Sequence, residues 1–146
     1  MEDARRELLE TVGEGVPFLC SLATVGGDGA PSVRFVRAKA DQELTLRIPT
    51  FVGTDKVREI CTDGRVCIAC GDTDSERPGT YFRIDGRAEI RTDPAERKTC
   101  WTPRLAKWFS DPDDENYAVV RVTPTAILAS PIGRAGAPSV WKAEPV

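Results

Sequence analysis

Six stretches of this chain read as β-strands, and the links between them are short. In each stretch apolar residues alternate with polar ones or form a brief apolar run, as in strands that bury one face or both. The expected strands cover residues 18–25, 32–40, 43–48, 65–71, 81–91 and 117–122. A segment at 125–129 is expected to prolong the last strand beyond Pro124 as an edge, and Gly86 to mark a bend or a close approach in its neighbour. This pattern predicts a mainly β fold, a six-stranded antiparallel split β-barrel, because closure removes exposed strand edges.

Helices are expected at the periphery of this barrel. An apolar residue recurs at every fourth position over 4–12, which predicts an amphipathic opening helix. Thr54 is expected to cap a short helix with its hydroxyl. Asp93, which precedes a proline, predicts the start of another helix that restarts at a later proline. On that helix Trp101 and Trp108 are expected to share one face, as a core or interface anchor rather than as a platform for a ligand ring.

Length and composition indicate one domain over residues 1–130, followed by a C-terminal tail over 131–146. A chain of 146 residues can bury roughly 68–70% of its unfolded surface, so its core needs neither a metal nor disulfides. The tail is rich in glycine, proline and alanine, and Trp141 is its only residue that we expect could pack against the domain.

Composition excludes several classes of function. The chain has no histidine, which rules out a Ser-His-Asp triad, a Cys-His pair and an HExxH zinc site. A net charge of −3 provides no general cationic field, so we expect no nucleic-acid partner. No apolar stretch is long enough to cross a membrane, and the charged first residues do not resemble a signal segment. We therefore expect a cytoplasmic protein that does not bind membranes.

The five cysteines are expected to be free thiols. Cys67 and Cys70 have CxxC spacing, but on a strand their side chains point to opposite faces. No second such pair or histidine completes a metal shell, so we predict no metal site. Cys20, Cys61 and Cys100 are expected to be small buried apolar residues.

Cations and hydroxyls concentrate around the second and third expected strands. Three cations fall within six residues with no acid among them, and desolvating such a row is costly unless an anion meets it. Two threonines and a lysine follow at the next strand end and helix start, where free backbone N–H groups favour a phosphate. The set comprises Arg34, Arg37, Lys39, Thr50, Thr54 and Lys56.

The same residues also allow a simpler interpretation. They could be solvated side chains that pair with nearby acids, since charged surface faces are common. The acids in question are Asp41, Glu43, Asp55 and Glu59.

The spacing of these residues resembles that of a known family. Arg34-x-Val36-x-x-Lys39, then Thr50, then Thr54-x-Lys56 is similar to the motif of the FMN-binding split barrels of the pyridoxamine 5′-phosphate oxidase class. The flanking sequence over residues 18–24, 29–34 and 84–88 most resembles that of the general stress protein branch. The resemblance covers residues 1–130.

This resemblance implies a homodimer with FMN in a cleft between the subunits. Arg34 and Lys56 would hold the phosphate together with Thr50 and Thr54. The backbone of the strand from Arg34 to Lys39 would run beside the isoalloxazine ring, and the Lys39 side chain would reach the flavin or its phosphate. That strand segment comprises Arg34, Phe35, Val36, Arg37 and Lys39.

Some positions depart from the family pattern. Pro49 replaces an aromatic residue, Asp55 stands where the family often has arginine, and Tyr81 lies near the place of a flavin-contacting glutamine. The Arg-x-His that grips substrate in the oxidases cannot exist in a chain without histidine, so true pyridoxamine phosphate oxidation is not expected.

The resemblance implies an oxidoreductase in which the flavin supplies the redox chemistry for a small-molecule substrate, with no side chain as an obligate catalyst. Two alternatives stay open. One is a deazaflavin-dependent reductase with a deazaflavin coenzyme on the same barrel. The other is a non-catalytic stress protein that binds flavin or haem.

Overall fold

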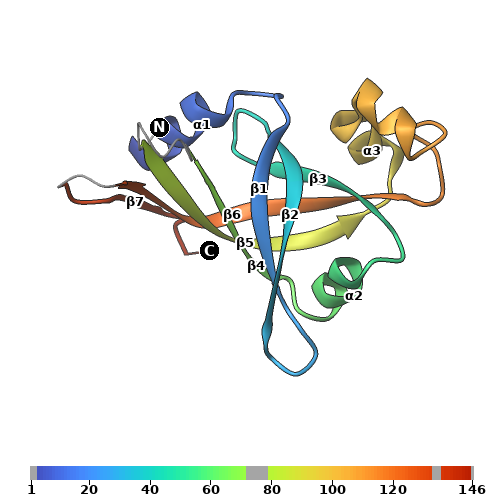
Figure 1. Cartoon of the computed structure of the whole chain (residues 1–146), viewed down its shortest axis with the longest axis horizontal. Coiled ribbons are helices and arrows are strands. Elements are labelled where there is room, and N and C mark those ends of the chain that lie inside the picture. Colours follow the sequence, from blue (N-terminus) through green and yellow to red (C-terminus); the bar gives the residue numbers. More distant parts are fainter. Residues whose placement is uncertain (1–2, 72–78, 133–135, 146) are drawn as a thin grey trace.

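The computed structural model describes residues 3–71, 79–132 and 136–145, and the strands in these ranges close into a barrel (Figure 1). The sheet order is β3-β2-β1-β4-β5-β6-β7, all neighbours are antiparallel, and β3 also pairs with β6. The strands are β1 Phe18–Val25, β2 Pro31–Ala40, β3 Leu46–Phe51, β4 Arg65–Gly71, β5 Thr80–Arg91, β6 Tyr117–Pro131 and β7 Ser139–Lys142. The predicted mainly β, six-stranded antiparallel barrel is confirmed, and β7 extends the sheet beyond it.

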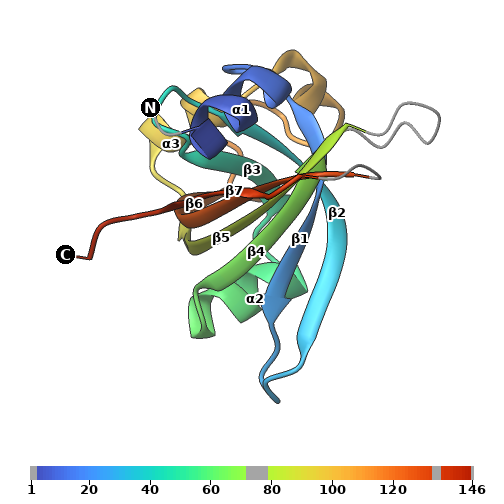
Figure 2. The same ribbon diagram turned by 90° about the vertical axis from the view of Figure 1, so that its left-hand side faces the viewer.

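The helices lie around the barrel, as the sequence predicts. They are α1 Asp3–Val12, α2 Asp55–Thr62, α3 Pro94–Cys100 and the 3₁₀ helix η1 Pro103–Lys107. In Figures 1 and 2, α1 and α2 lie at opposite ends of the barrel, and α1 contacts β6 and β7. None of the described helices is long and apolar enough to cross a membrane.

Two apolar clusters form the core. The main cluster fills the barrel with side chains that are fully buried, and Trp141 of β7 packs against it. Its largest members include Leu22, Ile48, Ile68, Phe82, Ile84 and Ile127. A smaller cluster under η1 comprises Cys100, Leu105, Phe109, Tyr117 and Val119.

The predicted start of the third strand is wrong, because a turn occupies its first residues. The Asp41 side chain accepts hydrogen bonds from the backbone N–H groups of Glu43 and Thr45, at 3.0 and 2.9 Å. Leu44 between them has a φ of 63°, a left-handed conformation outside the β region. The strand therefore begins only at Leu46.

The 125–129 segment is not an edge, because β6 continues through Pro124 and pairs with β5 on one side and β7 on the other. Pro124 has no N–H to donate, and it lies opposite Gly86, where the β5–β6 register shifts. A Cβ on Gly86 would lie 2.9 Å from the Thr123 carbonyl oxygen, so the predicted close approach at this glycine is confirmed.

Three expectations about the helices are wrong. The Thr54 hydroxyl does not cap α2; it donates to the Phe51 carbonyl at 3.0 Å. Cys61 is exposed on the outer face of α2 rather than buried. Trp101 and Trp108 do not share a helix face, because α3 ends at Cys100 and η1 begins only at Pro103.

An ion pair attaches α3 to the barrel wall. The Arg47 guanidinium on β3 donates to the Glu96 carboxylate at 2.6 Å, and their side chains are only 12% and 10% exposed. Arg121 of β6 lies 3.5 Å from the same carboxylate. On the adjoining turn of α3, Arg97 Nε donates to the Tyr117 carbonyl at 2.9 Å, and the Tyr117 hydroxyl donates to the Arg97 carbonyl at 2.8 Å. These contacts fix the position of α3 and of η1, which follows it.

We predict that Glu96→Gln lowers the free energy of unfolding by about 2 to 3 kcal/mol, because it removes a mostly buried carboxylate that Arg47 and Arg121 share and leaves Arg47 with Asp41 as its only carboxylate partner among the described residues. Urea denaturation measures the change. The matched control is Asp55→Asn, which removes the partner of Arg58 in an exposed pair and should cost less than about 0.5 kcal/mol. Equal losses in the two variants would contradict this role for Glu96.

Candidate functional site

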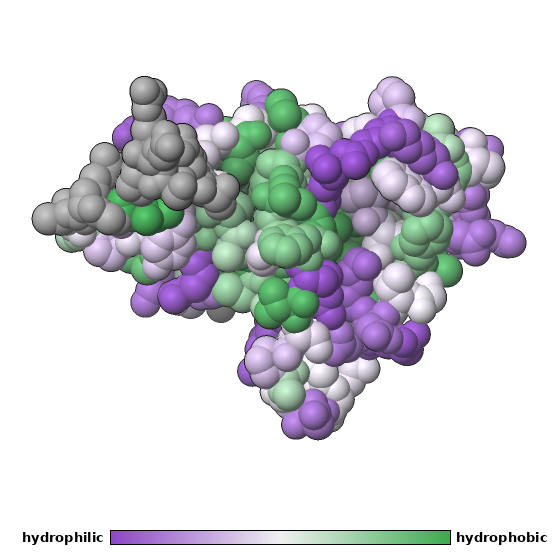
Figure 3. All heavy atoms as spheres, in the orientation of Figure 1, coloured by the Kyte–Doolittle hydropathy of each residue, from purple (hydrophilic) through white to green (hydrophobic). Residues whose placement is uncertain are grey.

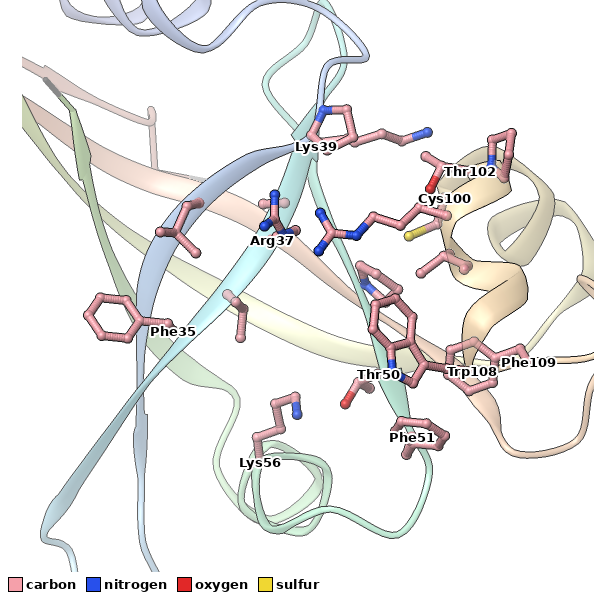
Figure 4. A pocket seen from close by; sticks show the side chains of 18 residues that line it. Phe35, Arg37, Lys39, Thr50, Phe51, Lys56, Cys100, Thr102, Trp108 and Phe109 are labelled. Atoms are coloured by element: carbon pink, nitrogen blue, oxygen red, sulfur yellow. The ribbon is translucent and has the colours of Figure 1, made fainter.

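A pocket of about 620 Å³ opens on the barrel wall between β2, β3 and η1 (Figure 4). Residues 35–39 of β2 and 49–51 of β3 form one side, and residues of the 102–109 segment form the other. Lys56 of α2 lies at one end of the pocket, and Lys39 lies at the opposite end in this view. This volume is within the range of small-molecule and cofactor sites.

The charged side chains that line the pocket are all positive. Arg37, Lys39, Lys56 and Arg104 line it, whereas none of the described residues that line it is acidic. The whole chain carries a net charge of −3, so this local excess of four cations runs against its overall balance. A concave surface with uncompensated positive charge concentrates and binds anions.

Lys56 is a partly buried cation. Burial, together with the nearby Arg34 guanidinium, lowers the pKa of Lys56. Among the described residues, no carboxylate forms an ion pair with it. A lysine in the first turn of a helix also opposes the helix dipole, and a bound anion would relieve both costs.

Two threonine hydroxyls lie beside this end of the pocket. Thr50 is buried at the end of β3, and its Oγ1 lies 3.4 Å from Oγ1 of Thr54. Because no side chain caps α2, the first N–H groups of this helix remain available to an anion.

Arg34 does not line this pocket. Its guanidinium donates to Glu59 of α2 at 3.0 Å and to Thr24 Oγ1 at 2.7 Å. The simpler interpretation of the cation row, pairing with a nearby acid, therefore holds for Arg34 and fails for Lys56.

The structure brings most of the other predicted residues together. Arg37 is exposed at the pocket wall, and Lys39 donates to the Thr99 carbonyl on α3 at 3.0 Å. Phe35 is 77% exposed at the pocket rim, because alternate residues of β2 point outward from the barrel. The predicted residues that line the pocket are Phe35, Val36, Arg37, Lys39, Thr50 and Lys56.

The wall around η1 contains pocket residues that are not among the predicted site residues. Arg104 lies 5.8 Å from the centroid of the Trp108 ring, and Trp108 is half exposed in the pocket. Phe51 and Phe109 pack with their centroids 4.6 Å apart. The only sequence signal for this wall is the spacing of Arg104 and Trp108, which lie four positions apart shortly after Thr102.

Four of the five thiols have a raised pKa and so are not activated as nucleophiles. Burial raises the pKa of Cys20 and Cys70 to about 12 and that of Cys67 to about 11. Cys100 lines the pocket, yet burial raises its pKa as well. All four stay protonated at neutral pH, so Cys100 presents no thiolate nucleophile to the pocket.

Comparisons with known proteins identify the family of this chain. A family model described as pyridoxamine 5′-phosphate oxidase matches residues 1–130. General stress protein 26 of Bacillus subtilis (strain 168) is 31% identical over 107 residues, which are 73% of this chain and 75% of that protein.

Solved structures show the same fold. General stress protein 26 of Bacillus anthracis strain Sterne gives a TM-score of 0.73 at 21% identity, covering 86% of this chain and 92% of that one. An F420 reductase gives a TM-score of 0.60 at 25% identity, covering 82% of this chain and 94% of that one. The resemblance inferred from the motif is confirmed, and this chain belongs to the pyridoxamine 5′-phosphate oxidase family.

Proposed function

We propose that this protein is an FMN-binding oxidoreductase that acts on a small-molecule redox substrate. The observation that carries the proposal is the pocket itself, in which four cations and a wall of aromatic residues meet without an acidic side chain among the described lining residues. FMN combines a planar aromatic ring with a phosphate dianion, and the pocket offers a complement to each part.

The phosphate fits the end of the pocket at α2. The Lys56 ammonium, the Thr50 and Thr54 hydroxyls and the first N–H groups of α2 would hold it. The ring would lie along β2, with Phe35, Val36 and Arg37 beside it. These residues fit the cofactor because they supply hydroxyl and amide donors and a positive charge for the phosphate, and apolar surface with further cations beside the ring.

The bound flavin would supply the redox chemistry, and the protein would supply position and electrostatics. The cations Arg37, Lys39 and Arg104 raise the potential in the pocket, which favours the anionic form of a reduced flavin. No lining side chain is needed as an acid or base, in keeping with the high pKa of the Cys100 thiol. The five free cysteines fit a reducing compartment, so we place the protein in the cytoplasm.

We also propose a homodimer with the pocket at the subunit boundary. The outer face of β1 and β2 is apolar, and Figure 3 shows it as a hydrophobic patch at the centre of the molecule. Leu19, Val33 and Phe35 on this face are 60%, 66% and 77% exposed. Since Leu19 and Phe35 also line the pocket, a second copy on this face would cover apolar surface and complete the pocket wall.

A deazaflavin-dependent reductase is the second candidate. The observation in its favour is the similarity to an F420 reductase over 82% of this chain. A deazaflavin coenzyme also joins a planar ring to a phosphate, so the same pocket could receive it.

The absorption spectrum of the purified protein tests the cofactor. We expect a flavin spectrum, and mass spectrometry of the molecule released on denaturation should identify FMN.

Lys56→Gln should retain much less flavin because it removes the desolvated cation, while Lys98→Gln on the exposed face of α3 should retain it fully. Release of a deazaflavin would favour the second candidate, and release of haem a carrier. Absence of nicotinamide-dependent turnover in a flavin-loaded protein would also favour a carrier.

FMN affinity should fall at alkaline pH. The phosphate binds the charged form of Lys56, whose pKa lies below the ordinary lysine value, so affinity declines as pH rises through that lowered pKa. Flavin fluorescence titrations over the alkaline range measure this. Riboflavin, which lacks the phosphate, should not show the decline, and Lys56→Arg should move it to higher pH. The same pH dependence for riboflavin and FMN would contradict this role for Lys56.

Phe35→Asp should convert the dimer to a monomer and weaken flavin binding, because it places a charge in the apolar face and at the pocket rim. Light scattering after size-exclusion chromatography reports the mass. Val140→Asp, at an apolar position on β7 that is 55% exposed, is the control and should leave the mass unchanged. A monomeric wild-type protein would contradict the proposed assembly.

A further inference from the structure

Two cysteines point into the barrel from neighbouring strands. Alternate side chains of β1 are buried, and Cys20, which is 3% exposed, belongs to this inward set. On β4, Val66 and Ile68 are buried, and Cys70 continues the same inward alternation. Cys20 is a member of the main core cluster, and Cys70 packs against that cluster. The two thiols therefore share one apolar interior.

The pairing of β1 with β4 brings these two cysteines opposite each other. The antiparallel register joins Ser21 to Ala69, and one step further along both strands lie Cys20 and Cys70. Residues directly opposite in an antiparallel pair have Cα atoms about 4.5 to 5.5 Å apart, and a disulfide spans Cα separations of roughly 4.4 to 6.8 Å. Burial, together with the nearby Cys70 thiol, raises the pKa of Cys20 to about 12, which agrees with this proximity. The backbone spacing therefore permits a disulfide between them.

The other three cysteines are placed differently. Cys67 has CxxC spacing to Cys70, but it lies on the opposite face of β4. Cys61 is exposed on α2, and Cys100 belongs to the smaller cluster under η1. The candidate partner of Cys70 is therefore Cys20, about 50 residues away on another strand, rather than its neighbour in sequence.

We propose that Cys20 and Cys70 are a dithiol that a hydroperoxide oxidises to a disulfide, which links β1 to β4 inside the barrel. Cys70 is partly exposed near the end of β4, so the peroxide reaches it first. Its sulfur takes the terminal OH of the peroxide and becomes a sulfenic acid, while the O–O bond breaks and the other oxygen leaves with the thiol proton. The Cys20 sulfur then forms the S–S bond, and the S–O bond breaks to release water with the second thiol proton. The two sulfurs lose two electrons, and these reduce the peroxide.

Burial makes this oxidation slow. It raises the pKa of Cys70, like that of Cys20, to about 12, so little of the reactive thiolate is present at neutral pH. The pair therefore stays reduced in a reducing compartment and closes only under sustained exposure to oxidant. Neither cysteine lines the flavin pocket, so this site is independent of the proposed function.

The closed disulfide would stabilise the folded chain. It closes a loop of about 50 residues that contains β2, β3 and α2. Such a loop restricts the unfolded chain, and these elements carry Arg37, Lys39 and Lys56 of the flavin pocket.

Peptide mapping of the oxidised wild-type protein tests the pair. The folded protein is treated with excess hydrogen peroxide, quenched with catalase, denatured and alkylated with iodoacetamide, beside an untreated sample. We expect a linked pair of peptides that contain Cys20 and Cys70, only in the treated sample. The melting temperature of the linked protein should rise by about 10 °C, and dithiothreitol should reverse the rise.

Three variants separate this pair from the other thiols. Cys67→Ser, on the same strand but the opposite face, is the matched control and should keep both the link and the rise in melting temperature. Cys20→Ser and Cys70→Ser should each lose both. Where a variant in the core unfolds, the mapping of the wild-type protein carries the test.

The contrary outcomes are distinct. Exposed Cys61 reports whether enough oxidant was present. If Cys61 is oxidised while Cys20 and Cys70 both remain free for alkylation, the inference is overturned. A link between Cys67 and Cys70, or links only between separate chains, would also overturn it. So would a Cys20–Cys70 link that does not raise the melting temperature, because such a link would distort the barrel rather than fit it.

Discussion

Pairing between β3 and β6 is the interaction on which the rest of the molecule depends. Six consecutive residue pairs, from Leu46 with Val122 to Phe51 with Tyr117, join these strands and close the sheet. Closure holds the end of β3 between the start of α2 and the segment around η1. The pocket exists because of this arrangement: its charged side chains come from β2, α2 and η1, and no single segment of the chain could assemble them.

Much of the fold follows from local patterns. Alternating and apolar runs identify every strand of the barrel, and β1 and β4 start and end where the sequence indicates. The start of β3 escapes prediction because the Asp41 side chain organises a turn and Leu44 adopts a left-handed backbone, which alternation does not reveal. Strand β7 escapes as well, because its only sequence signal is Trp141 within a segment rich in glycine and proline.

The candidate site is predictable where it is local in sequence. Thr50 and Lys56 lie within one strand-to-helix link, so their proximity follows from the chain itself. The wall that carries Arg104 and Trp108 depends on the ion pair between Arg47 and Glu96, which joins residues 49 positions apart. Sequence shows that such charges exist, but only the folded chain shows which of them are paired. Arg34 and Lys56 make the same point, since one has an acid beside it and the other has none among the described residues.

The shared use of β6 has a consequence for how the chain acquires its structure during synthesis. This strand pairs with β3, β5 and β7, and it is the last long strand to be made. Until it leaves the ribosome, β3 and β5 present unpaired edges that invite association with other chains. Its pairing with β3 closes a loop of many residues, which favours slow folding. A nascent chain that stops before β6 is therefore an open sheet prone to aggregation, whatever the stability of the finished barrel.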